Sequence, residues 1–156
     1  MMRIALFGAT GRVGSRVLAE ALTRNHEIIA ISHGQKNTEQ RDRVCVIMGD
    51  ILDPHSIELC ARGTDAAVCA YGPGQDTMTR DLQETLPRSA RALVAGLPRA
   101  GVRRLVVVGG AGSLEVAPGV QLVDTKAFGS GFSAKQHPVP TSALVGNGLA
   151  AQHMIR

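Results

Sequence analysis

The chain has 156 residues, a length that suits one domain. Hydrophobic residues make up 44%, enough for a sizeable core, whereas aromatic residues are only 3% and tryptophan is absent. The formal net charge is +4, but the basic residues form no long run, and the aromatic side chains that stack on bases are scarce. We therefore expect no nucleic-acid partner, and the mild basicity suits an anionic small molecule.

Cysteine usage and hydropathy indicate the cellular compartment in which the protein is expected. The three cysteines, Cys45, Cys60 and Cys69, are odd in number and lack the spacing of metal ligands, so no metal site is expected. Cys45 and Cys69 lie in apolar segments and are predicted to be buried. Gly8 and Gly11 interrupt the first apolar run, and no run reaches the roughly 18–20 residues that cross a bilayer. We predict a cytoplasmic protein without a membrane partner.

The first predicted strand, Arg3–Phe7, leads directly into three glycines spaced three residues apart: Gly8, Gly11 and Gly14. A helical pattern follows from about Arg12 to Arg24. A strand, a glycine-rich turn and a helix in this order form a dinucleotide-binding unit, because the helix N-terminus offers N–H groups and partial positive charge to a pyrophosphate. The alternative is a glycine-rich turn that closes a βα unit without a ligand.

Strand and helix patterns then alternate. Asp53 and Pro54 are predicted to cap and open a helix that Gly63 ends. A long helical pattern runs from Met78 to Leu97, and Pro87 is expected to kink or restart it. Pro98 and Gly101 are expected to end that helix. The further predicted strands are Glu27–Ser32, Val44–Met48, Ala66–Ala70 and Arg104–Val108.

These elements predict an α/β fold, a Rossmann-type doubly wound parallel sheet of about five strands with an irregular C-terminal tail. In such a sheet the ligand lies beyond the carboxyl ends of the strands. Residues 1–125 form the predicted domain, and residues 126–156 a divergent or truncated tail. Ser142–Val145 and Leu149–Ile155 could form short pieces, but there is no clear sixth strand. Without one, the edge of strand 104–108 would be open to association, which would favour a homo-oligomer.

Several segments resemble the atypical short-chain dehydrogenases with an NmrA-like or flavin- and biliverdin-reductase-like Rossmann domain, and the NAD-dependent epimerase/dehydratase-like proteins. The resemblance covers roughly residues 2–125 and implies an NAD(P) cofactor. The segments that carry it are Gly8–Gly14, Gly49–Asp53, Ala70–Gly74 and Gly101–Glu115.

The resemblance also implies which residues contact each part of the cofactor. One group follows the first strand, one follows the third and one follows the fourth. They are Gly8, Thr10, Gly11, Arg12, Val13 and Gly14 for the pyrophosphate, Asp50 and Ile51 for the adenine, and Ala70, Tyr71 and Gly72 for the ribose and nicotinamide side.

The end of the second strand bears on the choice between NAD and NADP. An acidic residue there binds the ribose 2′-hydroxyl, whereas a basic one suits a 2′-phosphate. The segment Ser32–Lys36 carries no carboxylate, and His33 and Lys36 could meet a phosphate, with Arg12 adding charge. We therefore expect NADP(H) to be preferred over NAD(H). The alternative is that His33 is a solvated loop histidine.

The catalytic residues are harder to assign. Tyr71 is the only tyrosine, and Gln75 stands four residues later, where the Tyr-x-x-x-Lys pair of short-chain dehydrogenases would place lysine. The next cation along the chain is Arg80. Ser113 could donate a hydrogen bond to a substrate carbonyl, although a serine in a glycine-rich loop also serves turn formation. Ser113 and Tyr71 are the two catalytic candidates.

Three functions fit these features. The first is an NAD(P)H-dependent reductase of an unidentified small molecule, such as a flavin, a quinone or another carbonyl compound, with hydride transfer supplied by the cofactor. The second is a non-catalytic NAD(P)-sensing regulator with a protein partner, which the missing Tyr-x-x-x-Lys pair favours. The third is an isomerase or dehydratase that retains its cofactor, and the missing pair counts most strongly against it.

Overall fold

The computed structural model describes residues 1–34, 42–72, 80–109, 115–121, 125 and 150–154. Strands and helices alternate through most of the chain. The elements are β1 (Arg3–Phe7), α1 (Gly14–Thr23), β2 (Glu27–Ser32), β3 (Val44–Met48), α2 (Pro54–Ala61), β4 (Ala66–Cys69), α3 (Arg80–Arg99), β5 (Arg104–Val108), β6 (Glu115–Ala117), β7 (Val120–Gln121) and β8 (Ala150–Met154).

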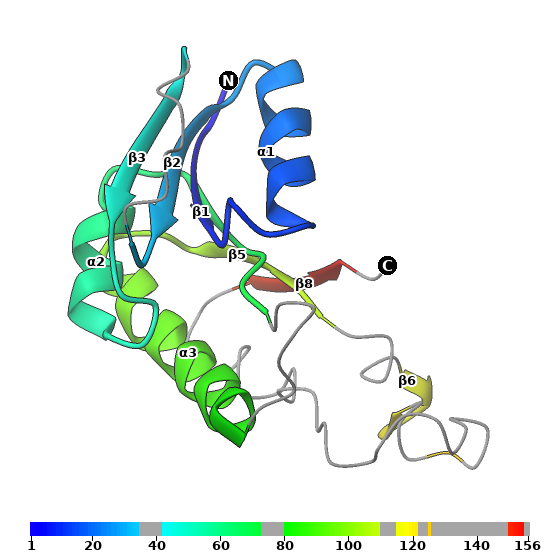
Figure 1. The fold of residues 1–156 in the computed structure, drawn as a ribbon. Helices are drawn as coiled ribbons and strands as arrows, with labels where there is room; N and C mark the ends of the chain where they lie inside the picture. The colour runs from blue at the N-terminus through cyan, green and yellow to red at the C-terminus, as the bar shows by residue number, and fades with distance from the viewer. Residues whose placement is uncertain (35–41, 73–79, 110–114, 122–124, 126–149, 155–156) are drawn as a thin grey trace.

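The main sheet has six strands in the order β3-β2-β1-β4-β5-β8, and all of its strand pairs are parallel. The chain moves outward from β1 through β2 to β3, returns to β4 beside β1, and continues to β5. Helix α1 lies on one face of the sheet, and α2 and α3 lie on the other (Figure 1). This arrangement confirms the predicted Rossmann-type fold, whose reversal point lies between β1 and β4.

The core follows from the alternation of side chains along the strands. In β1, Leu6 points toward α1, whereas Ala5 and Phe7 point toward α2 and α3, and all three are at most 1% exposed. Both faces of the strand are thus apolar, as expected for a parallel sheet covered on both sides. Burial of one such side chain as large as Leu6 or Phe7 contributes about 1.5–3 kcal/mol.

Helix α3 runs without interruption from Arg80 to Arg99, with Pro87 and Pro98 inside it. The expected restart at Pro87 therefore does not occur, and Pro98 does not end the helix. Gly101 ends it instead: its φ is +83°, and the N–H of Val102 donates to the Leu97 carbonyl at 3.0 Å. This is the glycine-terminated helix end that a left-handed residue allows.

The C-terminal part of the described chain departs from prediction. β8 pairs in parallel with β5, so Ala150–Met154 supplies a sixth strand that the sequence did not clearly indicate and covers the edge expected to be open. β6 and β7 form a separate antiparallel hairpin that was not predicted. The domain boundary at residue 125 stays a prediction.

The cysteines divide differently from the prediction. Cys69 is buried as expected, but Cys45 is exposed. The predicted burial of Cys45 was wrong because β3 is an edge strand, a position that its apolar sequence alone does not reveal. Cys60, on α2, is also buried.

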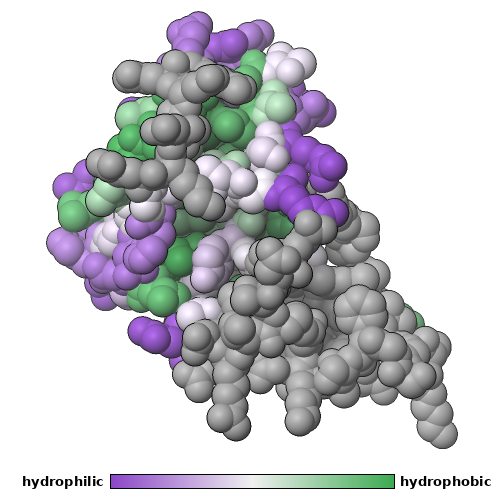
Figure 2. All heavy atoms as spheres, viewed as in Figure 1, coloured by the Kyte–Doolittle hydropathy of each residue, from purple (hydrophilic) through white to green (hydrophobic). Residues whose placement is uncertain are grey.

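The described surface mixes hydrophilic and hydrophobic side chains (Figure 2). Among the exposed apolar residues, Met48 on β3 and Leu59 on α2 are more than half exposed. A cavity of about 240 Å³ opens at the amino-terminal edge of the strands, where Arg3, Arg43 and Cys45 contribute to its lining, far from the carboxyl-end loops. Within the described ranges, no helix has both the length and the apolar character to cross a membrane.

Candidate functional site

The chain turns sharply at Gly8, directly after β1. Gly8 has a φ of +80°, and a Cβ at this position would lie 2.8 Å from both the Ala70 carbonyl oxygen and the Tyr71 nitrogen. The turn is closed by the Gly11 N–H, which donates to the Gly8 carbonyl at 3.0 Å. The missing side chain therefore permits both the backbone conformation and the close approach of the loop that follows β4.

Helix α1 begins against this turn and leaves its N-terminus uncapped. A Cβ at Gly14 would overlap the Gly8 carbonyl oxygen, so only glycine allows the helix to start here. The N-cap residue, Val13, makes no side-chain cap hydrogen bond, and the first turn contains no acidic residue. Thr10, Gly11 and Arg12 just before the helix are exposed. The Ser15 N–H donates to the Gly11 carbonyl at 2.9 Å and the Arg16 N–H to the Val13 carbonyl at 3.0 Å. No side-chain cap or acidic residue of the first turn offsets the positive end of the helix dipole here, and such an end favours an anion.

The loop after β4 borders the glycine turn. The Ala70 N–H donates to the Phe7 carbonyl at 2.9 Å and extends the pairing of β1 with β4. Tyr71 is half-buried against the core, whereas Gly72 is exposed, and a Cβ there would have nothing within 4 Å. Cys69 lies beneath this loop, where burial raises the pKa of its thiol to about 11 against an opposing hydrogen bond from the Tyr71 backbone. Such a thiol is a packing group rather than a nucleophile.

The end of β2 forms a compact turn. The Ser32 hydroxyl donates to the Gly34 carbonyl at 2.8 Å, and the Ser32 carbonyl accepts the Gly49 N–H at 3.0 Å. The second bond joins the end of β2 to the end of β3. His33 is exposed between them, so its imidazole is accessible from solvent at this edge.

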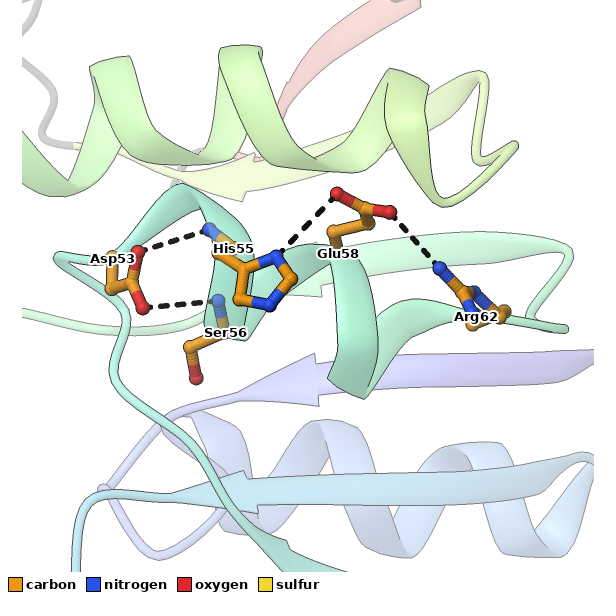
Figure 3. Close-up of polar contacts among 5 residues, drawn as sticks. All are labelled: Asp53, His55, Ser56, Glu58 and Arg62. Atoms are coloured by element: carbon orange, nitrogen blue, oxygen red, sulfur yellow. Dashed lines mark hydrogen bonds and ion pairs between the residues drawn. The ribbon is translucent and has the colours of Figure 1, made fainter.

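The loop after β3 is tied to the start of α2. The Asp53 carboxylate accepts the N–H groups of His55 at 3.0 Å and Ser56 at 3.2 Å, which confirms it as the predicted N-cap (Figure 3). Asp50 is half-buried and accepts the Leu52 N–H through Oδ1 at 2.8 Å. Ile51, in contrast, is only 9% exposed and belongs to the core, so most of its side chain packs on the protein.

The order of the strands brings these loops together. Because the strands are parallel, the loops after β3, β2, β1 and β4 lie side by side along the carboxyl edge in that order. Asp50, His33, the Gly8–Gly14 turn and Tyr71 therefore form one continuous edge. In the described portion of the chain, no group of three or more histidine, cysteine or acidic residues could hold a metal ion.

Comparison with known families agrees with this geometry. Residues 8–138 match the family described as NAD(P)H-binding, and this stretch starts at the glycine turn and runs through β5. The chain belongs to the NAD(P)H-binding family. Its cofactor is accordingly a nicotinamide dinucleotide, the kind of ligand that an uncapped helix N-terminus above a parallel sheet accommodates.

Other members of the fold are longer. The uncharacterized protein YwnB of Bacillus subtilis is 33% identical over 152 residues, which are 95% of this chain and 64% of YwnB. A Burkholderia pseudomallei structure named as an exported protein is 43% identical with a TM-score of 0.70, over 92% of this chain and 63% of its own. A Bacteroides thetaiotaomicron structure named as an epimerase is 30% identical with a TM-score of 0.70, over 92% of this chain and 61% of its own. The chain thus spans less than two thirds of each.

The structure brings most of the predicted cofactor residues of this NAD(P)H-binding domain to one edge. The roles assigned to individual residues stay predictions. Lys36 and Ser113 lie outside the described residues, so the structure does not place the second candidate cation or the serine candidate for catalysis. Tyr71 is described and lies next to the Gly8–Gly14 turn, and it is half-buried.

Sequence reasoning missed one polar residue at this edge. The Ser56 hydroxyl accepts the Asp50 N–H at 2.9 Å, and the Ser56 N–H donates to Asp53. The signal was present as a serine three residues after a predicted Asp N-cap, a position that faces back toward the preceding loop. It passed unnoticed because serine in the first turn of a helix is common for capping reasons alone.

Proposed function

We propose that this chain is the cofactor-binding part of an NAD(P)H-dependent reductase that acts on a small molecule. The observation that carries the proposal is the start of α1 directly after the glycine turn, where neither a side-chain cap nor an acidic residue offsets the positive end of the helix dipole. When bound, the cofactor would supply the hydride. The chain spans less than two thirds of the length of the relatives reported above, so the reductase activity is proposed for the whole protein.

In this proposal, different residues of the carboxyl edge contact different parts of the cofactor. The helix N-terminus and Arg12 meet the pyrophosphate, and the missing side chains at the turn let the phosphates approach the backbone. Asp50 accepts the adenine amino group. Ala70 to Gly72 border the ribose and nicotinamide side, where Tyr71 offers a phenol to a substrate carbonyl. Protonation from solvent would complete the reduction without a Tyr-x-x-x-Lys pair.

NADPH is the proposed preferred cofactor. The described turn after β2, Ser32 to Gly34, contains no carboxylate to bind a 2′-hydroxyl, and His33 is exposed there. We expect NADPH to bind about 3–10-fold more tightly than NADH, and the ratio to fall in His33→Ala. Equal binding of the two cofactors by the wild-type chain would contradict the preference.

A specific observation also favours a second candidate, a non-catalytic NAD(P)-sensing regulator. Tyr71 is the only tyrosine, and Gln75 stands where the lysine of a short-chain dehydrogenase pair would be. The decisive experiment follows NADPH absorbance with a panel of flavins, quinones and aldehydes. Steady consumption with one acceptor class supports the reductase, whereas tight NADPH binding with no consumption by any acceptor supports the regulator.

A further inference from the structure

The loop that follows β3 is held by a closed set of hydrogen bonds. The Asp50 carbonyl accepts the Asp53 N–H at 3.2 Å, and the Asp50 carboxylate accepts the Leu52 N–H at 2.8 Å. Asp53 in turn accepts the Ser56 N–H at 3.2 Å, and the Ser56 hydroxyl accepts the Asp50 N–H at 2.9 Å. Ser56 is the residue through which α2 closes this circuit, once with its backbone and once with its side chain.

The same loop lies directly on α2. A Cβ at Gly49 would lie 2.7 Å from the Cys60 sulfur and 3.4 Å from the Ser56 hydroxyl oxygen. Cys60 is buried, and burial raises the pKa of its thiol while a hydrogen bond with the Ser56 side chain opposes the rise. The Ser56 hydroxyl is thus held against the loop by the Asp50 N–H, and the neighbouring Cys60 thiol donates to the Met48 carbonyl at 3.6 Å.

We propose that Ser56 is a positioning residue for recognition of the adenine, because it fixes the backbone from which the Asp50 carboxylate projects. This inference rests on the proposed function, in which Asp50 accepts the adenine amino group. Removal of the Ser56 hydroxyl leaves the N-cap bonds of Asp53 in place, because those involve only the backbone of His55 and Ser56. Besides the anchor of Asp50, the substitution removes the hydroxyl beside the buried Cys60 thiol, and the comparison of two cofactors separates these two effects.

The test uses two cofactors and three variants. NADPH carries the adenine amino group, whereas deamino-NADPH carries hypoxanthine, in which a carbonyl oxygen replaces the amino donor and the neighbouring ring nitrogen carries a hydrogen instead. The dissociation constants of both are measured for the wild-type chain and for Ser56→Ala, Ser56→Thr and Ser89→Ala. Ser89 is a matched control, because it is a buried helical serine whose hydroxyl donates to Leu86 within α3.

We expect Ser56→Ala to weaken the binding of NADPH about fivefold, which corresponds to the loss of one hydrogen bond. The binding of deamino-NADPH should weaken less than about twofold. Ser56→Thr, which keeps the acceptor oxygen, and Ser89→Ala should stay within about twofold of the wild-type chain for both cofactors. A general loss of structure would weaken both cofactors alike. The ratio between the two cofactors therefore reports on positioning.

Four results would overturn the inference. Unchanged NADPH binding in Ser56→Ala, or an equal loss for both cofactors, would remove the adenine-specific role while leaving the proposed function intact. Loss of discrimination in Ser56→Thr equal to that in Ser56→Ala would show that the hydroxyl is not the relevant group. Failure of the wild-type chain to bind NADPH would overturn the proposed function, and this inference with it.

Discussion

Helices α1 and α2 both begin at the carboxyl edge of the sheet, and their first residues differ. α1 starts at Gly14 behind Val13, with neither a side-chain cap nor an acidic residue in its first turn. α2 starts at Pro54 behind Asp53, whose carboxylate accepts two backbone N–H groups. The helix dipole favours an anion at the N-terminus of each helix. At α2 the Asp53 carboxylate is that anion, whereas at α1 no side-chain cap or acidic residue of the first turn supplies one.

The loops that precede the two helices follow the same contrast. The Gly8–Gly14 turn is exposed at Thr10, Gly11 and Arg12, whereas the Asp50–Asp53 loop is tied to α2 by side-chain hydrogen bonds. In the proposed function the open start of α1 binds a phosphate, and the closed start of α2 supports the side chain of Asp50. Four substitutions or conditions break or sharpen this contrast.

The largest expected effect is at the open start. Gly14→Ala places a Cβ over the Gly8 carbonyl oxygen, so the helix or the turn must move. We expect the free energy of unfolding to fall by about 3 kcal/mol, the upper end for overpacking, and NADPH binding to be lost. Urea denaturation measures the first and fluorescence titration the second. Gly34→Ala, with nothing within 4 Å of its Cβ position, is the control for stability, and equal effects of the two variants would contradict the packing argument.

The second effect concerns the thiol below the open edge. The pKa of Cys69 is raised from 9.0 to about 11, so the unfolded chain loses this proton at lower pH than the folded chain. Stability from the neutral thiol is therefore complete below pH 9 and is lost as the pH rises toward 11, by about 2–3 kcal/mol. Denaturation of the wild-type chain and of Cys69→Ala between pH 8 and 11 measures it. Parallel curves for the two proteins would contradict the burial of Cys69.

The third effect is at the closed start. Asp53→Ala removes the cap of α2 and should lower the free energy of unfolding by about 1 kcal/mol. NADPH binding should weaken by less than about threefold, because Asp53 is not the group that meets the phosphates. Asp53→Asn keeps a capping oxygen and should stay within about 0.5 kcal/mol of the wild-type chain. If Asp53→Ala lost more free energy of NADPH binding than free energy of unfolding, the contrast between the two helices would be contradicted.

The smallest expected change in the free energy of unfolding is an increase, at the first turn of α1. Ser15→Glu places a carboxylate in the first turn of α1 and should stabilise the fold by about 0.5 kcal/mol, as charge at a helix N-terminus does. The same charge should weaken the binding of NADPH about tenfold, because it repels the negatively charged pyrophosphate proposed to bind at this helix N-terminus. Ser15→Gln, which is neutral, should do neither. Unchanged binding in Ser15→Glu would place the phosphates elsewhere.

The sequence predicted the elements whose signals are local. β1, β2, β3 and β5 have the predicted bounds, and Asp53 caps α2 as expected, because periodicity and capping are set by neighbouring residues. α1 begins two residues later than predicted, since Gly11 and Arg12 belong to the turn that closes on Gly8.

What the sequence did not predict depends on distant partners. β8, with the sequence Ala-Ala-Gln-His-Met, has little strand propensity of its own and exists through its pairing with β5. Cys45 is exposed because β3 lies at the edge, which depends on the order of the strands and not on its apolar sequence. The role of Ser56 depends on the contact between the Asp50 loop and α2, which the sequence alone does not reveal.

The central claim is that the uncapped start of α1 binds the pyrophosphate of a nicotinamide dinucleotide. Titration with NADPH, followed by nicotinamide fluorescence, tests it most directly in the wild-type chain, Gly11→Asp and Ala19→Asp. Ala19 lies on the exposed surface of the same helix, so its variant adds the same charge away from the turn. Micromolar binding by the wild-type chain and by Ala19→Asp, with loss in Gly11→Asp, is the predicted result. No binding by the wild-type chain, or equal binding by Gly11→Asp, would contradict the claim.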